Sequence, residues 1–422
     1  MILVVGGGLA GLICAKALHE AGRAVRILEA ADAPGGRIRT DQHRDGFLLD
    51  RGFHTLLTAY PAVRRHLDLA ALRPCALKPG AVLVRGGKWH ETGDPWPRHS
   101  LLGLTGGAST LAAGDKVRLA RLQGQARGQS VGTIFTSKQR DRSALEELDA
   151  RGFTRDGFIE PFAGPYLGGV FLDRKLESSA RMLLFTIKML AEGDVALPEG
   201  GIGAITAQLV AGLPAGAVRG GMRVEGIVEA DERAIGVTLP GGEEMQGEAV
   251  VIATDAATAH RLTLREIPCD PIAATCLYFA SDRPLYAGAR LLVNADPGAF
   301  VSHALQVSNV APGYAPAGQH LLAVALAGAP AAGSDLAAQA RAELAAWFPG
   351  HDLATLRHLA TYAIPHARYH QPAGIFATLP PNATPTRGLF VAGEFTESST
   401  MHGAMHSGEK AATAVLEYLR AE

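Results

Sequence analysis

The sequence has no excess charge of either sign and few cysteines. Its 422 residues carry a formal net charge of -1, so nothing in the composition indicates a nucleic-acid partner. The four cysteines, Cys14, Cys75, Cys269 and Cys276, show no C-x-x-C and no metal-site spacing. This usage is typical of reduced structural thiols in a reducing compartment, with a disulfide between Cys269 and Cys276 as the minor alternative.

Long apolar runs are also missing. No stretch reaches the roughly 18 apolar residues of a membrane-spanning helix. The apolar start at Ile2 has no basic segment before it, and its glycines have nucleotide-loop spacing, which argues against a signal peptide. We therefore expect a cytoplasmic protein. Residues 98–106 place an apolar tip between basic residues; a buried core position is the favoured interpretation, and peripheral membrane contact is the alternative.

The first thirty residues carry the pattern of a nucleotide-binding unit. The predicted elements are a strand over 2–5, a helix over 9–20 and a second strand over 23–28. Gly6, Gly8 and Gly11 form G-x-G-x-x-G, which suits a tight turn, a close approach of pyrophosphate and close helix–strand packing, respectively. Glu29 ends the second strand, where an acid accepts from an adenosine ribose hydroxyl. This order predicts a dinucleotide site.

A second glycine pair follows in Pro34-Gly35-Gly36-Arg37. The two glycines allow close backbone approach to the same pyrophosphate, and the Arg37 guanidinium would offset its charge through forked hydrogen bonds. A surface turn with an incidental arginine is the alternative. A nicotinamide cofactor that comes and goes does not need this second clamp, whereas a tightly held FAD does, so the motif indicates FAD.

The other end of the chain suggests a matching unit. A strand is predicted over 389–392, followed by Gly393-Glu394 and a helix from about Gly403. Glu394 is placed to bond ribityl hydroxyls. Gly403 and Ala404 would present helix N–H groups to the N1–C2=O edge of a reduced flavin. The alternative is a plain C-terminal α/β unit with an exposed glutamate.

Six segments carry a family resemblance: VVGGGLAGL, GGRIRT, DGFLLDRGFHTLL, LPEGGIGAITAQL, VVIATDAATAHRL and GLFVAGEFTESSTMHGAMHSGEKAA. They resemble the superfamily of FAD-dependent amine oxidases, protoporphyrinogen oxidases and phytoene desaturases (carotenoid and squalene types). The resemblance implies an α/β fold, in which a mixed β-sheet plus helical substrate domain is inserted into a Rossmann-like FAD-binding domain of the glutathione-reductase type. The implied FAD domain comprises 1–73, 192–266 and 362–422, and the implied substrate domain comprises 74–191 and 267–361.

The resemblance also implies a set of FAD-binding residues. The expected set is Gly6, Gly8, Leu9, Ala10, Gly11, Glu29, Ala30, Gly35, Gly36, Arg37, Gly52, Phe53, His54, Val224, Gly393, Glu394, Gly403 and Ala404. Val224 matches a strand whose backbone contacts adenine, and an ordinary buried strand valine is the alternative. Inside the two insertions the sequence predicts a hairpin over 75–93, helices over 108–124, 143–150 and 334–347, and strands over 273–279 and 321–327.

The resemblance also distinguishes amine substrates from apolar substrates. Amine oxidases of this superfamily carry a lysine in a substrate-domain strand and an aromatic-cage tyrosine before the last helix. Here no lysine occurs between Lys188 and Lys410, and Thr400 stands at the tyrosine position. No cysteine follows Cys276, so we expect FAD to be held without a covalent bond. These departures favour a desaturase or dehydrogenase that acts on an apolar, isoprenoid-like or ring substrate. The electron acceptor, oxygen or a quinone, is not predicted.

Two other functions stay open: a flavin amine oxidase, and an FAD-binding protein without turnover. His54 and His402 are the candidate catalytic residues, although a structural role is the favoured interpretation of each histidine. His402 and His406 have no carboxylate at metal spacing, so we predict no metal site. Arg51 is expected to pair with Asp50 or with substrate, and an ordinary ion pair within the protein is the favoured interpretation. The oligomeric state is not predicted.

Overall fold

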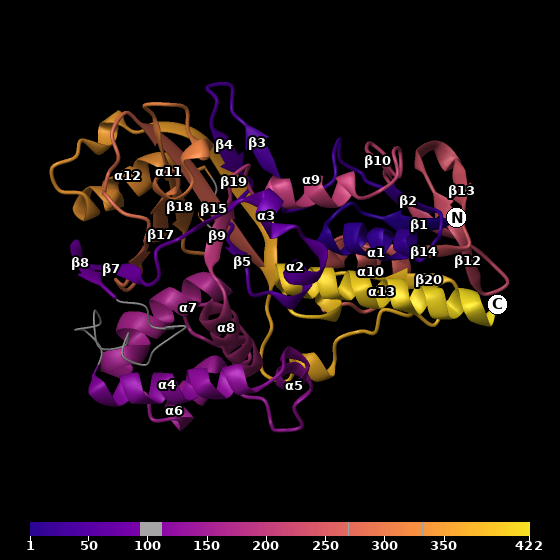
Figure 1. Ribbon diagram of the computed structural model, residues 1–422, viewed down its shortest axis with the longest axis horizontal. Helices are drawn as coiled ribbons and strands as arrows, with labels where there is room; N and C mark the ends of the chain where they lie inside the picture. Colours follow the sequence, from indigo (N-terminus) through magenta and orange to yellow (C-terminus); the bar gives the residue numbers. More distant parts are fainter. Residues whose placement is uncertain (93–111, 269, 329, 331–332) are drawn as a thin grey trace.

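The computed structural model describes residues 1–92, 112–268, 270–328, 330 and 333–422. The chain forms two lobes (Figure 1). A parallel sheet lies in the lobe that holds both termini, and a larger mixed sheet lies in the other. The longest helix, α13 (Met401–Ala421), runs along the first lobe and begins near the junction of the two (Figure 1).

The parallel sheet has five strands in the order β10-β2-β1-β14-β20. Their bounds are β1 Ile2–Val5, β2 Val25–Leu28, β10 Val218–Arg219, β14 Ala249–Ile252 and β20 Leu389–Val391. β1 is buried along its whole length, as expected for an apolar strand covered on both faces. Because successive side chains alternate, Ile2 and Val4 pack in one core cluster, and Leu3 and Val5 pack in another.

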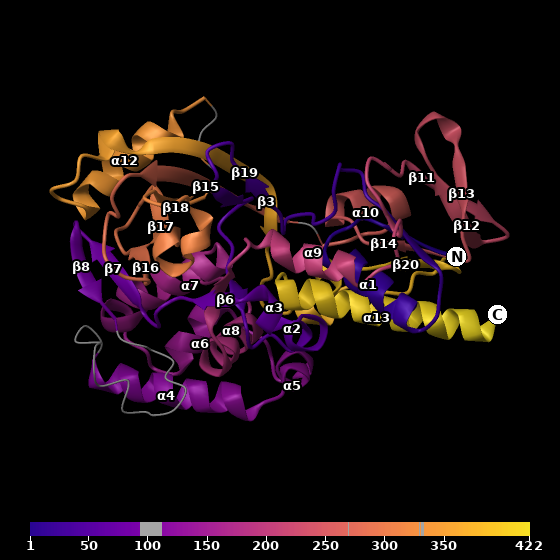
Figure 2. The same cartoon turned by 45° about the horizontal axis from the view of Figure 1, so that its top comes forward.

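Helices cover one face of this sheet and a small sheet covers the other (Figure 2). The helices of the first face include α1 (Leu9–Glu20), α9 (Gly203–Ala211), α2 (Pro61–His66), α3 (Leu69–Leu72) and α13. The second face is covered by α10 (Ala256–Thr263) and by the antiparallel strands β11 (Gly226–Ala230), β12 (Arg233–Thr238) and β13 (Glu244–Gln246). A Cβ at Gly408 would lie 2.4 Å from the carbonyl oxygen of Ala10, so glycine is required where α13 crosses α1.

The mixed sheet has seven strands in the order β19-β15-β18-β17-β16-β7-β8, and its neighbours are antiparallel except for the pair β16–β7. The bounds are β7 Ala81–Arg85, β8 Lys88–Glu91, β15 Pro271–Ser281, β16 Leu291–Asn294, β17 Val301–Gln306, β18 His320–Leu326 and β19 Arg357–Tyr369. Helix α12 (Leu336–Trp347) packs on one face through Leu344 and Trp347.

A group of helices completes the second lobe below the mixed sheet (Figure 1). They are α4 (Ala113–Gly128), α5 (Val131–Thr136), α6 (Ala144–Ala150), the π-helical η2 (Arg155–Ala163), α7 (Gly164–Phe171) and α8 (Ala180–Glu192). Phe158, Phe162 and Phe185 are almost fully buried among them. Their apolar faces lie on the far side of the sheet from α12, in a core cluster that continues into the parallel-sheet lobe.

Short elements connect these layers. They are β3 (Thr40–Gln42), β4 (Leu48–Asp50), β5 (Leu56–Leu57), β6 (Pro74–Ala76), β9 (Val195–Pro198), α11 (Val307–Val310) and the 3₁₀ turns η3 (Pro240–Gly242), η4 (Pro312–Tyr314), η5 (Leu353–Thr355), η6 (Ile375–Ala377) and η7 (Glu394–Thr396). β3 pairs with β4, and β9 pairs with both β5 and β6.

Several predicted elements are confirmed within a few residues: the hairpin β7–β8, α6, α12, β15 and β18. The helix predicted over 108–124 is α4, which runs to Gly128; residues 108–111 lie outside the described part of the chain. The last helix, predicted from about Gly403, starts two residues earlier. It begins at Met401, because the Thr400 hydroxyl accepts from the Gly403 N–H at 2.9 Å and makes Thr400 the N-cap.

The domain boundaries stay a prediction. The parallel sheet takes its strands from residues 2–28, 218–252 and 389–391, and the mixed sheet takes its strands from 81–91 and 271–369. The predicted boundary between 361 and 362 falls inside β19, which is continuous. The passage from one lobe to the other therefore lies within a strand rather than in a loop at this point.

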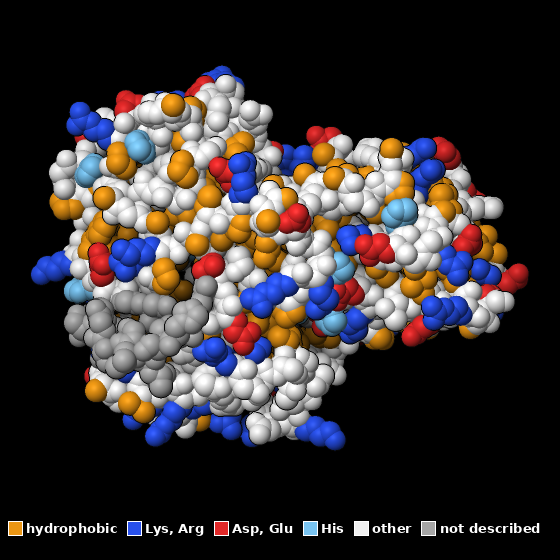
Figure 3. Space-filling model, in the orientation of Figure 1, with side chains coloured by type: hydrophobic (Ala, Val, Ile, Leu, Met, Phe, Trp, Pro, Cys, Tyr) orange, Lys and Arg blue, Asp and Glu red, His pale blue; other side chains and the backbone are white. Residues whose placement is uncertain are grey.

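No helix in the described residues is long and apolar enough to cross a membrane. Residues 98–106 and Cys269 lie outside the described residues, so neither the predicted apolar tip nor the alternative Cys269 disulfide has a structural counterpart here. On the face drawn in Figure 3, Lys and Arg are interspersed with Asp and Glu. Within the described ranges, no three His, Cys, Asp or Glu side chains gather as a metal site would require.

Candidate functional site

The carboxyl ends of the parallel strands open onto one cavity of about 550 Å³, which we call the dinucleotide cavity. Its wall includes Gly6 after β1, Glu29 after β2, Thr254 after β14 and Gly393 after β20. Ligands of open α/β sheets bind at this edge, and the volume lies in the usual range of cofactor pockets.

Each glycine of the first loop meets a different steric demand. Gly6 has φ +106, and a Cβ there would lie 2.6 Å from the carbonyl oxygen of Ala253. Around Gly8 no atom would lie within 4 Å of a Cβ, so the backbone at the start of α1 faces open space. A Cβ at Gly11 would lie 2.0 Å from the Gly6 oxygen, so glycine allows α1 to pack on β1. The loop therefore has room for a pyrophosphate beside the N-terminus of α1.

The Glu29 carboxylate is held against the cavity by backbone hydrogen bonds. Its Oε2 accepts from the Gly7 N–H at 2.7 Å, and its Oε1 accepts from the Ala31 N–H at 2.8 Å. A carboxylate has further lone pairs, so Glu29 can still accept from ribose hydroxyls. Val224, which is 4% exposed, lies in the same wall.

The second glycine pair lies against the first loop. Gly35 and Gly36 have φ +131 and +55, and a Cβ at Gly36 would lie 3.4 Å from the Cα of Gly8. The Arg37 guanidinium forms an ion pair with Glu394 and donates to the carbonyl oxygen of Ala367 at 3.0 Å. Arg37 therefore has protein partners that the predicted phosphate clamp did not include, and it ties the loop to β19 and to the end of β20.

A second cavity of about 320 Å³, which we call the inner cavity, adjoins the first. The wall that both cavities share consists of Arg37, His54, Ile364, Ala367, Ser399, Thr400 and Met401. Most of the remaining wall is apolar. It comes from α7 and α8 (Val170, Met182, Leu190), from the mixed sheet (Leu291, Val293, Leu326), and from β5, β9 and connecting segments (Leu57, Val195, Tyr60, Leu77, Leu172). An apolar molecule in the inner cavity would therefore lie beside a cofactor in the dinucleotide cavity.

Two histidines line the inner cavity in their neutral form. Burial lowers the pKa of His54, and its Nε2 lies 3.2 Å from the Arg51 carbonyl oxygen. Burial also lowers the pKa of His303, to about 4, and its ring lies edge-on to Phe53 with the centroids 4.4 Å apart. Both imidazoles are therefore uncharged at neutral pH.

Most of the expected FAD-binding residues line the dinucleotide cavity. The residues placed there are Gly6, Gly8, Leu9, Ala10, Glu29, Ala30, Gly35, Gly36, Arg37, His54, Val224, Gly393, Glu394 and Ala404. Gly11 lies behind the wall, and Gly52 and Phe53 line the inner cavity instead. Gly403 lines neither cavity. A Cβ there would lie 1.9 Å from the carbonyl oxygen of Ser398, so packing against Ser398 requires glycine at this position; the approach of Gly403 to the flavin stays a prediction.

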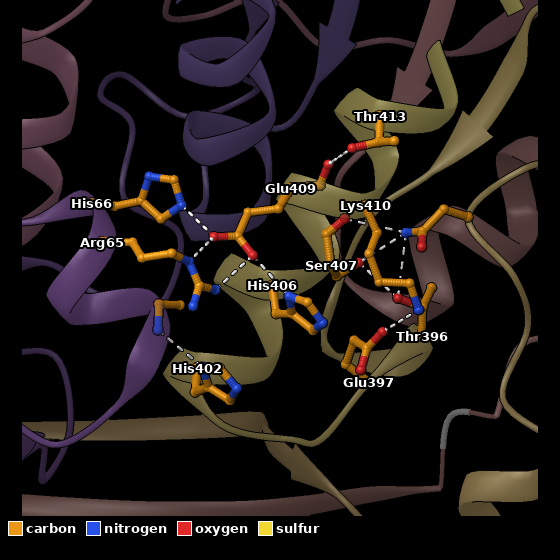
Figure 4. Close-up of polar contacts among 12 residues, drawn as sticks. Arg65, His66, Thr396, Glu397, His402, His406, Ser407, Glu409, Lys410 and Thr413 are labelled. Carbon is orange, nitrogen blue, oxygen red and sulfur yellow. Dashed lines mark hydrogen bonds and ion pairs between the residues drawn. The ribbon is translucent and has the colours of Figure 1, made fainter. Parts of the chain in front are cut away.

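His402 lies outside the walls of both cavities. Its side chain points from α13 toward α2, where Nδ1 accepts from the Ala62 N–H at 3.3 Å (Figure 4). The ring stacks on Tyr60, 5.9 Å between centroids, and burial lowers its pKa to about 4. Catalysis by His402 is therefore not part of the function proposed below.

Arg51 does not pair with Asp50. Its guanidinium makes three hydrogen bonds to Asp41, at 3.0, 3.0 and 2.9 Å. In the hairpin β3–β4, Asp50 faces inward and is 2% exposed; it accepts from Thr40 at 2.6 Å and from Tyr314 at 2.9 Å. Arg51 follows the last residue of β4, and its guanidinium contacts the partly exposed carboxylate of Asp41.

Sequence reasoning missed two parts of the dinucleotide cavity. Thr254 and Asp255 follow β14, and the rule that parallel strands end at one edge would have placed them beside Gly6. The other part is the β19 segment 364–367. No motif or periodicity marked it, because this strand joins the site only through the pairing of β19 with β15.

Comparison with known proteins identifies the family. The model of the family described as flavin containing amine oxidoreductase matches residues 9–416. A 15-cis-phytoene desaturase of Narcissus pseudonarcissus is 43% identical over 63 residues, which are 15% of this chain and 11% of that protein. A coproporphyrinogen III oxidase of Propionibacterium freudenreichii subsp. freudenreichii is 26% identical over 178 residues, which are 40% and 31% of the two chains. These alignments cover less than a third of each relative.

Solved structures share the fold along the whole chain. An oxidoreductase from Methanosarcina mazei has a TM-score of 0.71 at 20% identity and covers 99% of both chains. A putrescine oxidase bound to putrescine has a TM-score of 0.72 at 15% identity, covering 99% of this chain and 98% of that one. The predicted superfamily, fold class and FAD cofactor are thereby confirmed. The chain belongs to the family of flavin-containing amine oxidoreductases.

Proposed function

We propose that this protein removes a hydride from an apolar substrate, in the manner of a desaturase or dehydrogenase. The observation that carries the proposal is the inner cavity, whose wall is largely apolar and is shared in part with the dinucleotide cavity. The transfer of a hydrocarbon chain or ring from water into this cavity would be favourable by a free energy of about 25 cal/mol for each Å² of apolar surface buried.

Bound FAD supplies the acceptor for a hydride. The protein would hold the substrate against the shared wall at Ile364, Thr400 and Met401 and exclude water with the aliphatic side chains of α7 and α8. Formation of a carbon–carbon double bond releases one hydride and one proton from adjacent carbons. Neutral His54, which lies in the shared wall, is the candidate acceptor for that proton.

The inner cavity is poorly suited to a protonated amine. Ala274, Thr275 and Cys276 are the β15 residues in its wall, and none is the lysine expected of an amine oxidase. Thr400 takes the place of the cage tyrosine. The wall also carries Arg37, Lys78 and Arg368 against the single carboxylate of Asp194 among its described residues, and this excess of positive charge would repel an ammonium group.

An anaerobic flavin-bleaching assay tests the proposal. We expect carotenoid or quinol-like compounds to reduce the flavin, and benzylamine and a polyamine to leave it oxidised. Efficient bleaching by the amines alone would replace the proposal by an amine oxidase. No bleaching by any compound would favour an FAD-binding protein without turnover. Admitting oxygen or a quinone after bleaching would then identify the electron acceptor by the rate of reoxidation.

A matched pair of variants connects the reaction to the cavity. Leu190 lies in the inner-cavity wall, whereas Leu264 is 87% exposed. Leu190→Glu would bring a carboxylate among apolar groups, so we expect the rate of flavin reduction by an apolar substrate to fall by about tenfold or more, with FAD content unchanged. Leu264→Glu should leave the rate unchanged. Equal rates in both variants would remove the inner cavity from the proposal.

A further inference from the structure

We propose that the substrate of the inner cavity carries an anionic oxygen group on its apolar body and that Arg368 binds this group. The proposal rests on the proposed function, because it takes the inner cavity as the substrate cavity. It narrows the substrate class from apolar molecules in general to amphiphilic ones with a carboxylate or phosphate.

Arg368 occupies an unusual position for an arginine. It lies near the end of β19, half-buried, with its side chain in the inner-cavity wall. The guanidinium donates to the carbonyl oxygen of Val170 in α7, which also lines the cavity. Among the described residues it forms no ion pair with any carboxylate, and a guanidinium has several more N–H donors than this one bond uses.

Neighbouring charges do not neutralise Arg368. Burial lowers the pKa of its guanidinium, Glu394 opposes this shift, and Arg37 adds to it. The Glu394 carboxylate is already in an ion pair with Arg37 and accepts a hydrogen bond from Ser399 at 2.6 Å. Two guanidinium groups thus face one carboxylate, which leaves a net positive charge beside the shared wall.

The surroundings of this charge are apolar. Tyr60, Val170, Leu172 and Met182 line the same cavity. An unpaired cation among such side chains is costly unless a ligand supplies the counter-charge. The planar guanidinium fork matches a carboxylate or phosphate geometrically. A cation that has no carboxylate partner among the described residues and lies beside apolar wall residues therefore fits an amphiphile better than a plain hydrocarbon.

The position of Arg368 separates it from the cofactor site. It lines the inner cavity but not the dinucleotide cavity, whereas Arg37 lines both. Lys78 also lines the inner cavity, but its side chain is exposed and stays solvated. Arg368 is thus the less exposed of the two cations that line the inner cavity alone.

Calorimetric titration of the oxidised holoenzyme with three dodecyl probes tests the inference: dodecanoate, dodecyl phosphate and dodecan-1-ol, all with the same tail. We expect at least one anion to bind about tenfold or more tightly than the alcohol, the scale of a charge-assisted hydrogen bond. Arg368→Gln keeps an amide donor for Val170 and should abolish this preference, with little effect on the alcohol. The better of the two anions identifies the headgroup.

Two further variants make the test decisive. Lys78→Gln removes the exposed cation of the same cavity and should keep the preference for the anion. Arg368→Lys keeps the charge but not the fork and should retain part of it. FAD content and melting temperature establish that each variant is folded; if Arg368→Gln loses FAD, the lysine variant decides. Equal binding of anion and alcohol, or a preference lost in Lys78→Gln instead, would overturn the inference.

The binding test needs no turnover, so its failure differs from failure of the proposed function. Headgroup preference that depends on Arg368, without bleaching by any apolar compound, would remove the desaturase proposal and keep the anion site. Bleaching by apolar compounds without any headgroup preference would keep the desaturase proposal and remove the anion site.

Discussion

At the scale of single residues, the pair Arg37 and Glu394 joins three parts of the chain that are far apart in sequence. Arg37 follows the second glycine pair, Glu394 follows β20, and the Ala367 carbonyl of β19 accepts from Arg37. Both side chains line the dinucleotide cavity. The pair therefore positions the cofactor loops and supplies a cation close to the expected pyrophosphate.

Arg37→Ala should weaken FAD binding by about 1.5–3 kcal/mol, because a charge-assisted contact is lost and Glu394 is left without its cation. This corresponds to roughly 10- to 150-fold in the dissociation constant, measured by flavin fluorescence after dilution. The melting temperature of the holoenzyme should fall as well, since bound cofactor stabilises the folded state.

Arg39→Ala is the matched control for this change. Arg39 lies two residues further in the same motif, pairs with the exposed Asp32 at 3.1 Å and does not line the dinucleotide cavity. We expect its FAD affinity to stay within about twofold of the wild type. Equal losses in the two variants would mean that the arginines act through the fold of the loop, and not at the cofactor.

At the scale of elements, Glu409 connects α13 to α2. Its carboxylate accepts from Arg65 at 2.8 Å and lies 2.5 Å from Nε2 of His66, both on α2, and 2.7 Å from Nδ1 of His406 on its own helix (Figure 4). Burial alone would raise the pKa of Glu409, but hydrogen bonds from His406, His66 and Arg65 lower it well below the ordinary value. The contact matters for the site because α13 begins at the shared wall.

Glu409→Gln should destabilise the protein by about 1–3 kcal/mol at pH 7, the scale of a partly buried charged hydrogen bond. Because the folded protein holds the pKa of Glu409 below its ordinary value of 4.5, the stabilisation is present above that pH and is lost as the pH falls. Melting curves at pH 7 and pH 4 should therefore show a larger difference between variant and wild type at pH 7.

Glu417→Gln provides the control on the same helix, because Glu417 is exposed. Its melting temperature should follow the wild type at both values of pH. If the deficit of Glu409→Gln were equal at pH 7 and pH 4, the ionised carboxylate would not be what holds α2 and α13 together.

At the scale of the whole molecule, FAD would be enclosed by segments from both lobes, and no thiol of the described residues lines the dinucleotide cavity. The thiols of Cys14 and Cys276 are buried, and burial raises the pKa of each to about 12, so both are neutral. Cys276 lines the inner cavity but not the dinucleotide cavity.

We therefore expect FAD to leave the protein on denaturation. Acid precipitation should give a colourless pellet and a yellow supernatant that contains FAD in equal amount to the protein. A pellet that stays yellow after washing would contradict this expectation and point to a histidyl bond. His54 would then be the first residue to replace, because it lies in the wall between the two cavities.

The nucleotide-binding unit at the start of the chain could be predicted from the sequence alone. Local steric rules decide it: Gly6 and Gly36 adopt positive φ, Gly11 packs a helix on a strand, and an apolar strand must be buried on both faces. These demands act over a few residues and leave a pattern that can be read without the fold. The same holds for α6, whose capping box at Ser143 marks its start.

The inner cavity and its charge depend on the tertiary structure and could not be predicted from the sequence. Arg368 reaches Val170 across about 200 positions of sequence, and β19 meets the dinucleotide cavity because it pairs with β15. In the β3–β4 hairpin Arg51 pairs with Asp41 and not with Asp50, and His402 on α13 contacts α2. Such contacts depend on long-range packing, which has no local signature, so composition and spacing could not have identified them.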